Sequence, residues 1–202
     1  KWLTYNAVND LMKGIYSVLL SNTILPGSFI GMSADNSMAY IIVYFSLMMH
    51  GYICVPLSMH LSNEHASNII QEAKLKAIFV DENTTKLTYE TIIKDSLKSS
   101  GGANKGVSGK KSLRTASSTV VQPLLLSCMH FNDPDNFNNW IKTNTNTNGN
   151  PNPNTNITER DIEDPMLVLY TSGSTGAPKG AIMSERSFLM EARGMMRLDH
   201  YQ

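Results

Sequence analysis

The residues most suited to chemistry form one run near the end of the chain, at positions 171–180. The run contains four hydroxyl side chains, three glycines and one lysine. Glycine lets backbone N–H groups converge on one centre because no Cβ blocks close approach, and the hydroxyls add short donors. Lys179 adds a positive charge that can compensate charge as pyrophosphate leaves. The run therefore predicts a triphosphate-binding loop, contacting the nucleotide through Thr171, Ser172, Gly173, Ser174, Thr175, Gly176, Lys179 and Gly180.

Two roles within this loop are more specific. Lys179 is the predicted catalytic residue, because it is the one cation in the run. The hydroxyl of Thr171 or Thr175 is the predicted Mg²⁺ ligand, since Mg²⁺ prefers oxygen. A Walker-type phosphate loop is excluded, because Pro178 precedes the lysine and Gly180 follows it. By composition alone a flexible Gly/Ser linker is an equal alternative, but the strand-like runs on both sides argue against it.

The loop requires a rigid frame. Apolar residues precede it at 168–170 and return at 181–183, which predicts a strand, an exposed loop and a second short strand. Strands and helices alternate upstream, which indicates right-handed crossovers and an α/β fold with a largely parallel sheet and flanking helices. The other predicted strands are 28–32, 52–55, 76–80 and 123–131. The predicted helices are 4–22, 37–49, 62–73, 87–97 and 184–198, with a helical turn at 137–141.

Residues 38–49 are apolar except for Ser46. A helix that is apolar on all sides is expected to be buried, and this one is too short to span a bilayer, which needs about 20 residues. The sequence therefore predicts a core helix and no transmembrane segment.

Composition limits the class of protein. The chain has 202 residues, 42% hydrophobic, with 17 basic and 17 acidic side chains. Zero net charge without a basic run argues against nucleic-acid partners. Cys54 and Cys128 stand in apolar contexts and are expected to be reduced core residues. Segments 99–118 and 143–156 are poor in large apolar residues and are predicted to be disordered insertions in one domain.

Residues 170–180, Tyr-Thr-Ser-Gly-Ser-Thr-Gly-Ala-Pro-Lys-Gly, resemble the signature loop of the adenylate-forming (AMP-dependent synthetase/ligase) superfamily. Residues 2–11 resemble its opening motif, although Ala7 stands where an acidic residue is usual, and residues 50–57 resemble its second motif. The resemblance implies an acyl-CoA synthetase-like acid–thiol ligase. Such an enzyme uses ATP and Mg²⁺ to convert a carboxylic acid, with fatty acids favoured, to an acyl-adenylate and then transfers the acyl group to CoA.

The branch of the superfamily stays open. Ser184 and Glu185, followed by Arg186, replace a common Thr-His pair, which resembles carboxylic acid reductases and some long-chain acyl-CoA synthetases. Alternatively, Glu185 and Arg186 form an ordinary exposed first helical turn. An adenylation domain of a reductase or peptide synthetase, or an inactive truncated relative, is therefore the alternative function.

The family's ribose, adenine and acyl sites and its C-terminal lysine domain would follow Gln202. We therefore expect residues 1–202 to be an incomplete N-terminal AMP-binding domain that is inactive alone. A cytoplasmic location is expected, with peripheral membrane or organelle association left open.

Overall fold

The computed structural model describes residues 2–101, 122–145, 160–171 and 178–198. Its centre is a six-stranded sheet in the order β4-β3-β1-β2-β5-β6. The first five strands in the chain are parallel, and β6 is antiparallel to β5. The strands are β1 Phe29–Ser33, β2 Ile53–Pro56, β3 Ala77–Val80, β4 Leu124–Ser127, β5 Pro165–Thr171 and β6 Lys179–Ser184. The predicted α/β architecture with a largely parallel sheet is confirmed.

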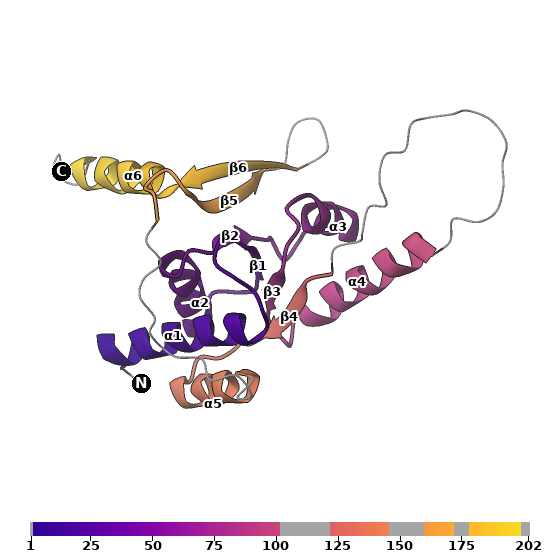
Figure 1. Ribbon diagram of the computed structural model, residues 1–202, viewed down its shortest axis with the longest axis horizontal. Helices are drawn as coiled ribbons and strands as arrows, with labels where there is room; N and C mark the ends of the chain where they lie inside the picture. Colours follow the sequence, from indigo (N-terminus) through magenta and orange to yellow (C-terminus); the bar gives the residue numbers. More distant parts are fainter. Residues whose placement is uncertain (1, 102–121, 146–159, 172–177, 199–202) are drawn as a thin grey trace.

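Helices cover both faces of the parallel strands. They are α1 Tyr5–Ser21, α2 Met38–Met49, α3 Asn63–Glu72, α4 Lys86–Gly101, α5 Pro134–Asn144 and α6 Glu185–Leu198. One buried cluster joins α1, α2 and α5 to the sheet, and a second cluster joins α3 and α4 to the other face. The β5–β6 pair and α6 extend from this three-layer body at the side away from α5 (Figure 1).

Three helices begin where the sequence predicts. The hydroxyl of Thr4 accepts the N–H of Ala7 at 3.2 Å, and Ser37 and Ser62 cap α2 and α3 in the same way. Each cap satisfies an N–H group that has no partner within the helix. Cys54 and Cys128 are buried and free, as predicted.

Helix α2 corrects one prediction. It spans residues 38–49 as expected, but it is not buried on all sides: Ile41, Phe45 and Met49 are 56%, 48% and 37% exposed. These side chains recur every four residues and so form one stripe. The opposite side of α2 contacts α1 and the sheet, and no other described element covers the stripe. Uniform apolarity could not reveal this one-sided packing.

The strand predicted at residues 123–131 is too long, because only Leu124–Ser127 forms a strand. The chain then turns and supplies partners to the start of α2. The carbonyl of Phe131 accepts the N–H of Ala39 at 3.1 Å, and the Asn132 side chain accepts that of Met38 at 2.9 Å. The helical turn predicted at 137–141 is part of a longer helix, α5, whose N-terminus is capped by Asp133.

The two predicted insertions lie almost entirely outside the described residues. Helix α4 continues to Gly101, and α5 ends at Asn144, so each enters the edge of a predicted insertion. No helix among the described residues is both long and apolar enough to cross a membrane.

Candidate functional site: the β5–β6 hairpin

The two ends of the predicted phosphate loop are held opposite each other in one hairpin. Thr171, the last residue of β5, pairs with Lys179, the first residue of β6. Residues directly opposite in an antiparallel pair project from the same face of the sheet. The hairpin thus places a hydroxyl and an ammonium group on one face, and both residues are exposed. The remaining predicted contacts, Ser172, Gly173, Ser174, Thr175 and Gly176, lie outside the described residues.

The structure gives a packing reason for glycine at position 180, which the sequence did not reveal. It lies opposite Tyr170, and a Cβ added to it would lie 3.1 Å from Cγ1 of Val168 and 3.2 Å from Cζ of Tyr170. The aromatic ring therefore occupies the space that a side chain at position 180 would need. Burial, followed by the charge of Glu72, raises the pKa of the Tyr170 phenol above its usual value.

Strand β5 carries the loop from the core to the surface. Met166, Leu167 and Val168 are buried, whereas Leu169 is 39% exposed and Thr171 is exposed. Leu167 also pairs with Cys54 of the neighbouring parallel strand β2. The loop therefore begins at the carboxyl edge of the parallel strands, where open α/β sheets bind ligands.

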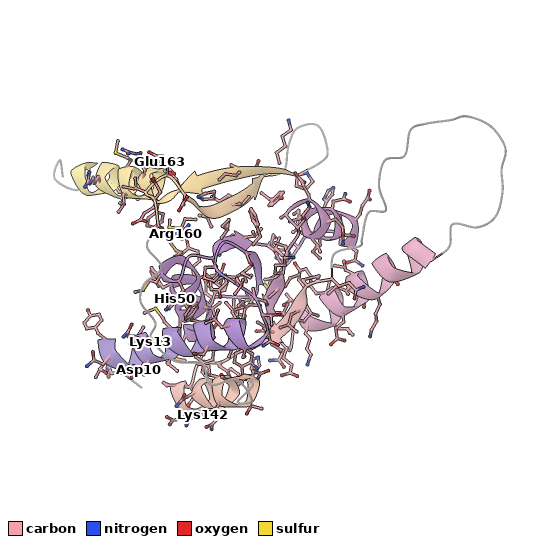
Figure 2. All side chains as sticks on the ribbon, viewed as in Figure 1. Asp10, Lys13, His50, Lys142, Arg160 and Glu163 are labelled. Carbon is pink, nitrogen blue, oxygen red and sulfur yellow. The ribbon has the colours of Figure 1, made fainter. Side chains whose placement is uncertain are left out.

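Arg160 anchors the start of β5 to the core, a role that sequence reasoning missed. Its guanidinium donates to the carbonyl of Met48, at 3.2 Å, and to the carbonyl of Pro165. The Met48 carbonyl belongs to the last turn of α2, where carbonyl groups lack partners within the helix. Figure 2 shows Arg160 between α2 and the hairpin. The Arg160 side chain thus joins the C-terminal end of α2 to Pro165, the first residue of β5.

The acidic segment before β5 forms a turn that meets α6. Glu163 pairs with the guanidinium of Arg186, and the N–H of Arg186 donates to the carbonyl of Ile162 at 2.9 Å. Arg186 is exposed in the first helical turn, as one alternative predicted, but it also links α6 to the base of the hairpin. Glu185 is also exposed.

A small pocket, here called the loop-base pocket, lies beside the hairpin and has a volume of about 100 Å³. Its walls come from the β2–α3 connection, the first turn of α3 and both ends of the predicted loop. His65 contributes from α3, and Thr171 and Pro178 contribute from the loop ends. Sequence reasoning did not bring His65 to this site, because positions 65 and 171 are distant in the chain.

The described side chains decide whether the chain could bind a metal ion and whether either cysteine could act as a nucleophile. Among the described residues, no group of three or more His, Cys, Asp or Glu side chains could hold a metal ion. The exposed Thr171 hydroxyl suits the predicted Mg²⁺ ligand in type, since Mg²⁺ accepts a single protein oxygen beside substrate phosphates and water. Burial raises the pKa of the Cys54 and Cys128 thiols, so neither is a candidate nucleophile.

Comparison with known proteins agrees with this arrangement. The model of the AMP-binding enzyme family matches residues 1–202. Human long-chain-fatty-acid–CoA ligase 1 is 25% identical over 203 residues, which cover 98% of this chain and 26% of the ligase. The polyketide synthase–nonribosomal peptide synthetase phmA of Phaeosphaeria nodorum is 26% identical over 186 residues, covering 92% of this chain and 4% of that protein.

The fold also matches solved structures. The structure of McyG A-PCP complexed with phenylalanyl-adenylate superposes with a TM-score of 0.67 at 20% identity, covering 100% of this chain and 31% of that one. This chain spans about a quarter of the length of the human ligase. Because the family model matches this chain from residue 1 to residue 202, the chain belongs to the AMP-binding enzyme family.

Proposed function

We propose that this chain forms the phosphate-binding part of an enzyme that activates a carboxylic acid with ATP. The observation that carries the proposal is the β5–β6 hairpin, which places Thr171 beside Lys179 at the two ends of the loop. In the proposed reaction, a carboxylate oxygen bonds to the α-phosphorus of ATP. The bond from that phosphorus to the bridging oxygen breaks, which gives an acyl-adenylate and pyrophosphate.

The described residues would act on the leaving group. The Lys179 ammonium would compensate the charge that develops on the departing pyrophosphate, and the Thr171 hydroxyl would orient a phosphate or ligate Mg²⁺. Mg²⁺, held by Thr171 or Thr175, would supply further charge compensation. The hairpin contributes positioning, because β5 is anchored by its buried half and by Arg160.

For the complete enzyme, we propose a fatty acid as the carboxylate and CoA as the final acyl acceptor. The name of the human relative, a long-chain-fatty-acid–CoA ligase, supports this assignment. The alternative is an adenylation domain, either of a peptide synthetase, which the similarity to phmA supports, or of a carboxylic acid reductase. A third alternative is an inactive truncated relative.

The decisive experiment measures ATP–pyrophosphate exchange by the longest natural polypeptide that contains this chain. We expect exchange with hexadecanoate and formation of its CoA thioester. Lys179→Ala should lower the exchange rate about 10²- to 10³-fold, which is typical of losing one stabilising group at a developing charge. Lys179→Arg is the matched control, because it keeps the charge and should recover part of the rate.

The alternatives give different results. Exchange with amino acids and no CoA thioester would favour the peptide synthetase. No exchange with any carboxylate would favour the inactive relative. The isolated 202-residue chain is expected to show no exchange, and activity in it would contradict our view that residues beyond 202 are needed.

A further inference from the structure

A β-bulge interrupts the β5–β6 pair close to the point where β5 begins. Between Pro165 and Leu167, β5 advances by two residues while β6 advances by one, so Met166 is an extra residue in the pair. A bulge bends the strand that carries it and changes the direction of the residues that follow. Leu167 also pairs with β2, so the bend lies where the hairpin joins the parallel sheet.

Arg160 holds the bulged end of β5 on a fixed part of the body. Its guanidinium donates to the carbonyl of Pro165 and, at 3.2 Å, to that of Met48 in the last turn of α2. That turn is itself tied to α1, because the Ser46 hydroxyl donates to the carbonyl of Met12 at 2.7 Å. Proline has no N–H group, so the start of the strand is held through its carbonyl. Hydrogen bonds thus run without a break from α1 through α2 to the base of the hairpin.

A strand that is held at its base acts as a lever for its tip. β5 has seven residues, and at about 3.3 Å per residue its last residue, Thr171, lies about 20 Å from Pro165. Over that length, a rotation of about 10° at the base moves the tip by about 3 Å. Lys179 pairs with Thr171 and moves with it. Since a misplacement of about 1 Å can cost about 10²-fold in rate, the angle of the hairpin matters for catalysis.

Helix α6 reports the direction of the hairpin. The N–H of Arg186 donates to the carbonyl of Ile162 at 2.9 Å, and its guanidinium pairs with Glu163. These contacts link the first turn of α6 to the turn before β5, and α6 follows β6 directly in the chain. A change in the angle of the hairpin therefore changes the distance from α6 to the helices of the body.

We propose that Arg160 is a positioning residue that sets the angle between the β5–β6 hairpin and the parallel sheet. By holding Pro165 on the last turn of α2, it places Thr171 and Lys179 at the far end of the hairpin. Arg160 thus acts on the reaction through Lys179 and not by contact with the substrate. The effect on catalysis rests on the proposed function, whereas the effect on the angle does not.

The angle is measured by double electron–electron resonance between two spin labels on the 202-residue chain. Asp10→Cys on α1 and Glu191→Cys on α6 supply the label sites, because both positions are exposed whereas Cys54 and Cys128 are 0% exposed. We expect one narrow distance distribution, which Arg160→Met shifts or broadens by several ångströms. Arg160→Lys should recover part of the original distribution, since an ammonium group still donates to a carbonyl.

Ile141→Val is the control that separates positioning from stability. Ile141 is 6% exposed in α5, and the hairpin extends from the side of the body away from α5 (Figure 1). Removing a buried methylene should lower the melting temperature and leave the distance distribution unchanged. The inference is overturned if Arg160→Met leaves the distribution unchanged, or if Ile141→Val alters it as much.

ATP–pyrophosphate exchange by the longest natural polypeptide tests the catalytic part. Arg160→Met should lower kcat about 10²-fold, because the end of the loop is misplaced, whereas Ile141→Val should leave kcat unchanged below its melting temperature. Adding Arg160→Met to Lys179→Ala should slow exchange little further, because a residue that acts through Lys179 has no ammonium group left to position. Losses that multiply fully would show that Arg160 does not act through Lys179.

The results distinguish this inference from the proposed function. If Arg160→Met changes the distance distribution but the natural polypeptide shows no exchange, Arg160 sets the angle and the proposed function fails. If Lys179→Ala slows exchange but Arg160→Met alters neither exchange nor the distribution, the proposed function stands and the inference fails. A changed distribution with unchanged kcat would mean that Arg160 anchors the hairpin without positioning Lys179, which also overturns the inference.

Discussion

Tyr170 and Gly180 face each other across the β5–β6 pair, and a Cβ at position 180 would lie 3.2 Å from Cζ of the tyrosine ring. This separation is closer than an ordinary van der Waals contact, so a side chain at position 180 must displace the ring. The Tyr170 ring and the Val168 side chain therefore leave little room for a side chain at position 180.

Gly180→Ala is expected to destabilise the chain by about 1 kcal/mol, because a methyl group must displace Tyr170 and Val168. The measurement is the free energy of unfolding in urea. Gly194→Ala is the matched control: a Cβ there meets nothing within 4 Å, and replacing glycine inside a helix should stabilise by up to about 1 kcal/mol. An equal cost for Gly180→Ala in a Tyr170→Ala background would show that the tyrosine ring does not cause the cost and would assign it to Val168.

Arg160→Met is expected to cost about 1–3 kcal/mol, because two carbonyl groups, on Met48 and Pro165, lose a charged donor. Methionine keeps much of the length of the side chain and removes the guanidinium. Urea unfolding measures the loss, and Arg193→Met, at an exposed position on α6, is the control that should change stability little. If the two variants behave alike, Arg160 does not anchor the hairpin.

The Glu163–Arg186 pair should contribute much less. The two side chains are 59% and 58% exposed, and exposed ion pairs stabilise by about 0–1 kcal/mol. A double-mutant cycle with Glu163→Gln and Arg186→Gln should therefore give a small coupling energy that falls further in 1 M NaCl. A coupling energy well above 1 kcal/mol that is insensitive to salt would mean that this pair fixes α6 to the hairpin.

Burial of His50 is expected to make the folded chain less stable at acid pH. His50 is 4% exposed, its ring stacks on that of Tyr16 with centroids 4.5 Å apart, and its Nδ1 lies 2.8 Å from the Ser46 carbonyl oxygen. Burial lowers the pKa of His50, so the unfolded chain binds the proton more readily than the folded chain. The stabilisation is present above about pH 6.5, the pKa of an unperturbed histidine, and is lost as the pH falls below it.

The expected slope from this one group is at most about 1.4 kcal/mol per pH unit. Urea unfolding at several pH values between 7.5 and 5 measures it. His50→Gln should flatten the pH dependence, although it also lowers stability, whereas His60→Gln should leave the slope unchanged because His60 is exposed. Parallel slopes for the wild-type chain and His50→Gln would refute the assignment.

Cys54 and Cys128 should resist thiol reagents in the folded chain. Both are 0% exposed, and burial raises the pKa of each thiol, which suppresses the reactive thiolate. At pH 8, Ellman's reagent should react slowly with the native chain and should titrate two thiols after unfolding in guanidinium. Fast labelling of either cysteine under native conditions would show that the core opens readily.

The sequence by itself determined most of the helices and strands, and it predicted the chemistry of the site. The predicted starts of three helices, at positions 4, 37 and 62, agree with the structure, because the hydroxyl cap found at each is a local interaction between a side chain and an N–H two or three residues away. Alternation of strands with helices predicted the parallel sheet, since parallel neighbours need crossover connections. The hydroxyl, glycine and lysine residues of the loop predicted phosphate chemistry from their functional groups alone.

Only the tertiary structure decided which distant residues meet. The exposed stripe of α2, with Ile41 and Phe45, depends on which faces other elements cover, and a uniformly apolar sequence contains no signal for that. The contact of Arg160 with Met48 spans 112 positions in the chain, and the approach of His65 to Thr171 spans a similar distance. Such contacts follow from strand order, which places β2 beside β5, because packing over long sequence separations is fixed by the whole core.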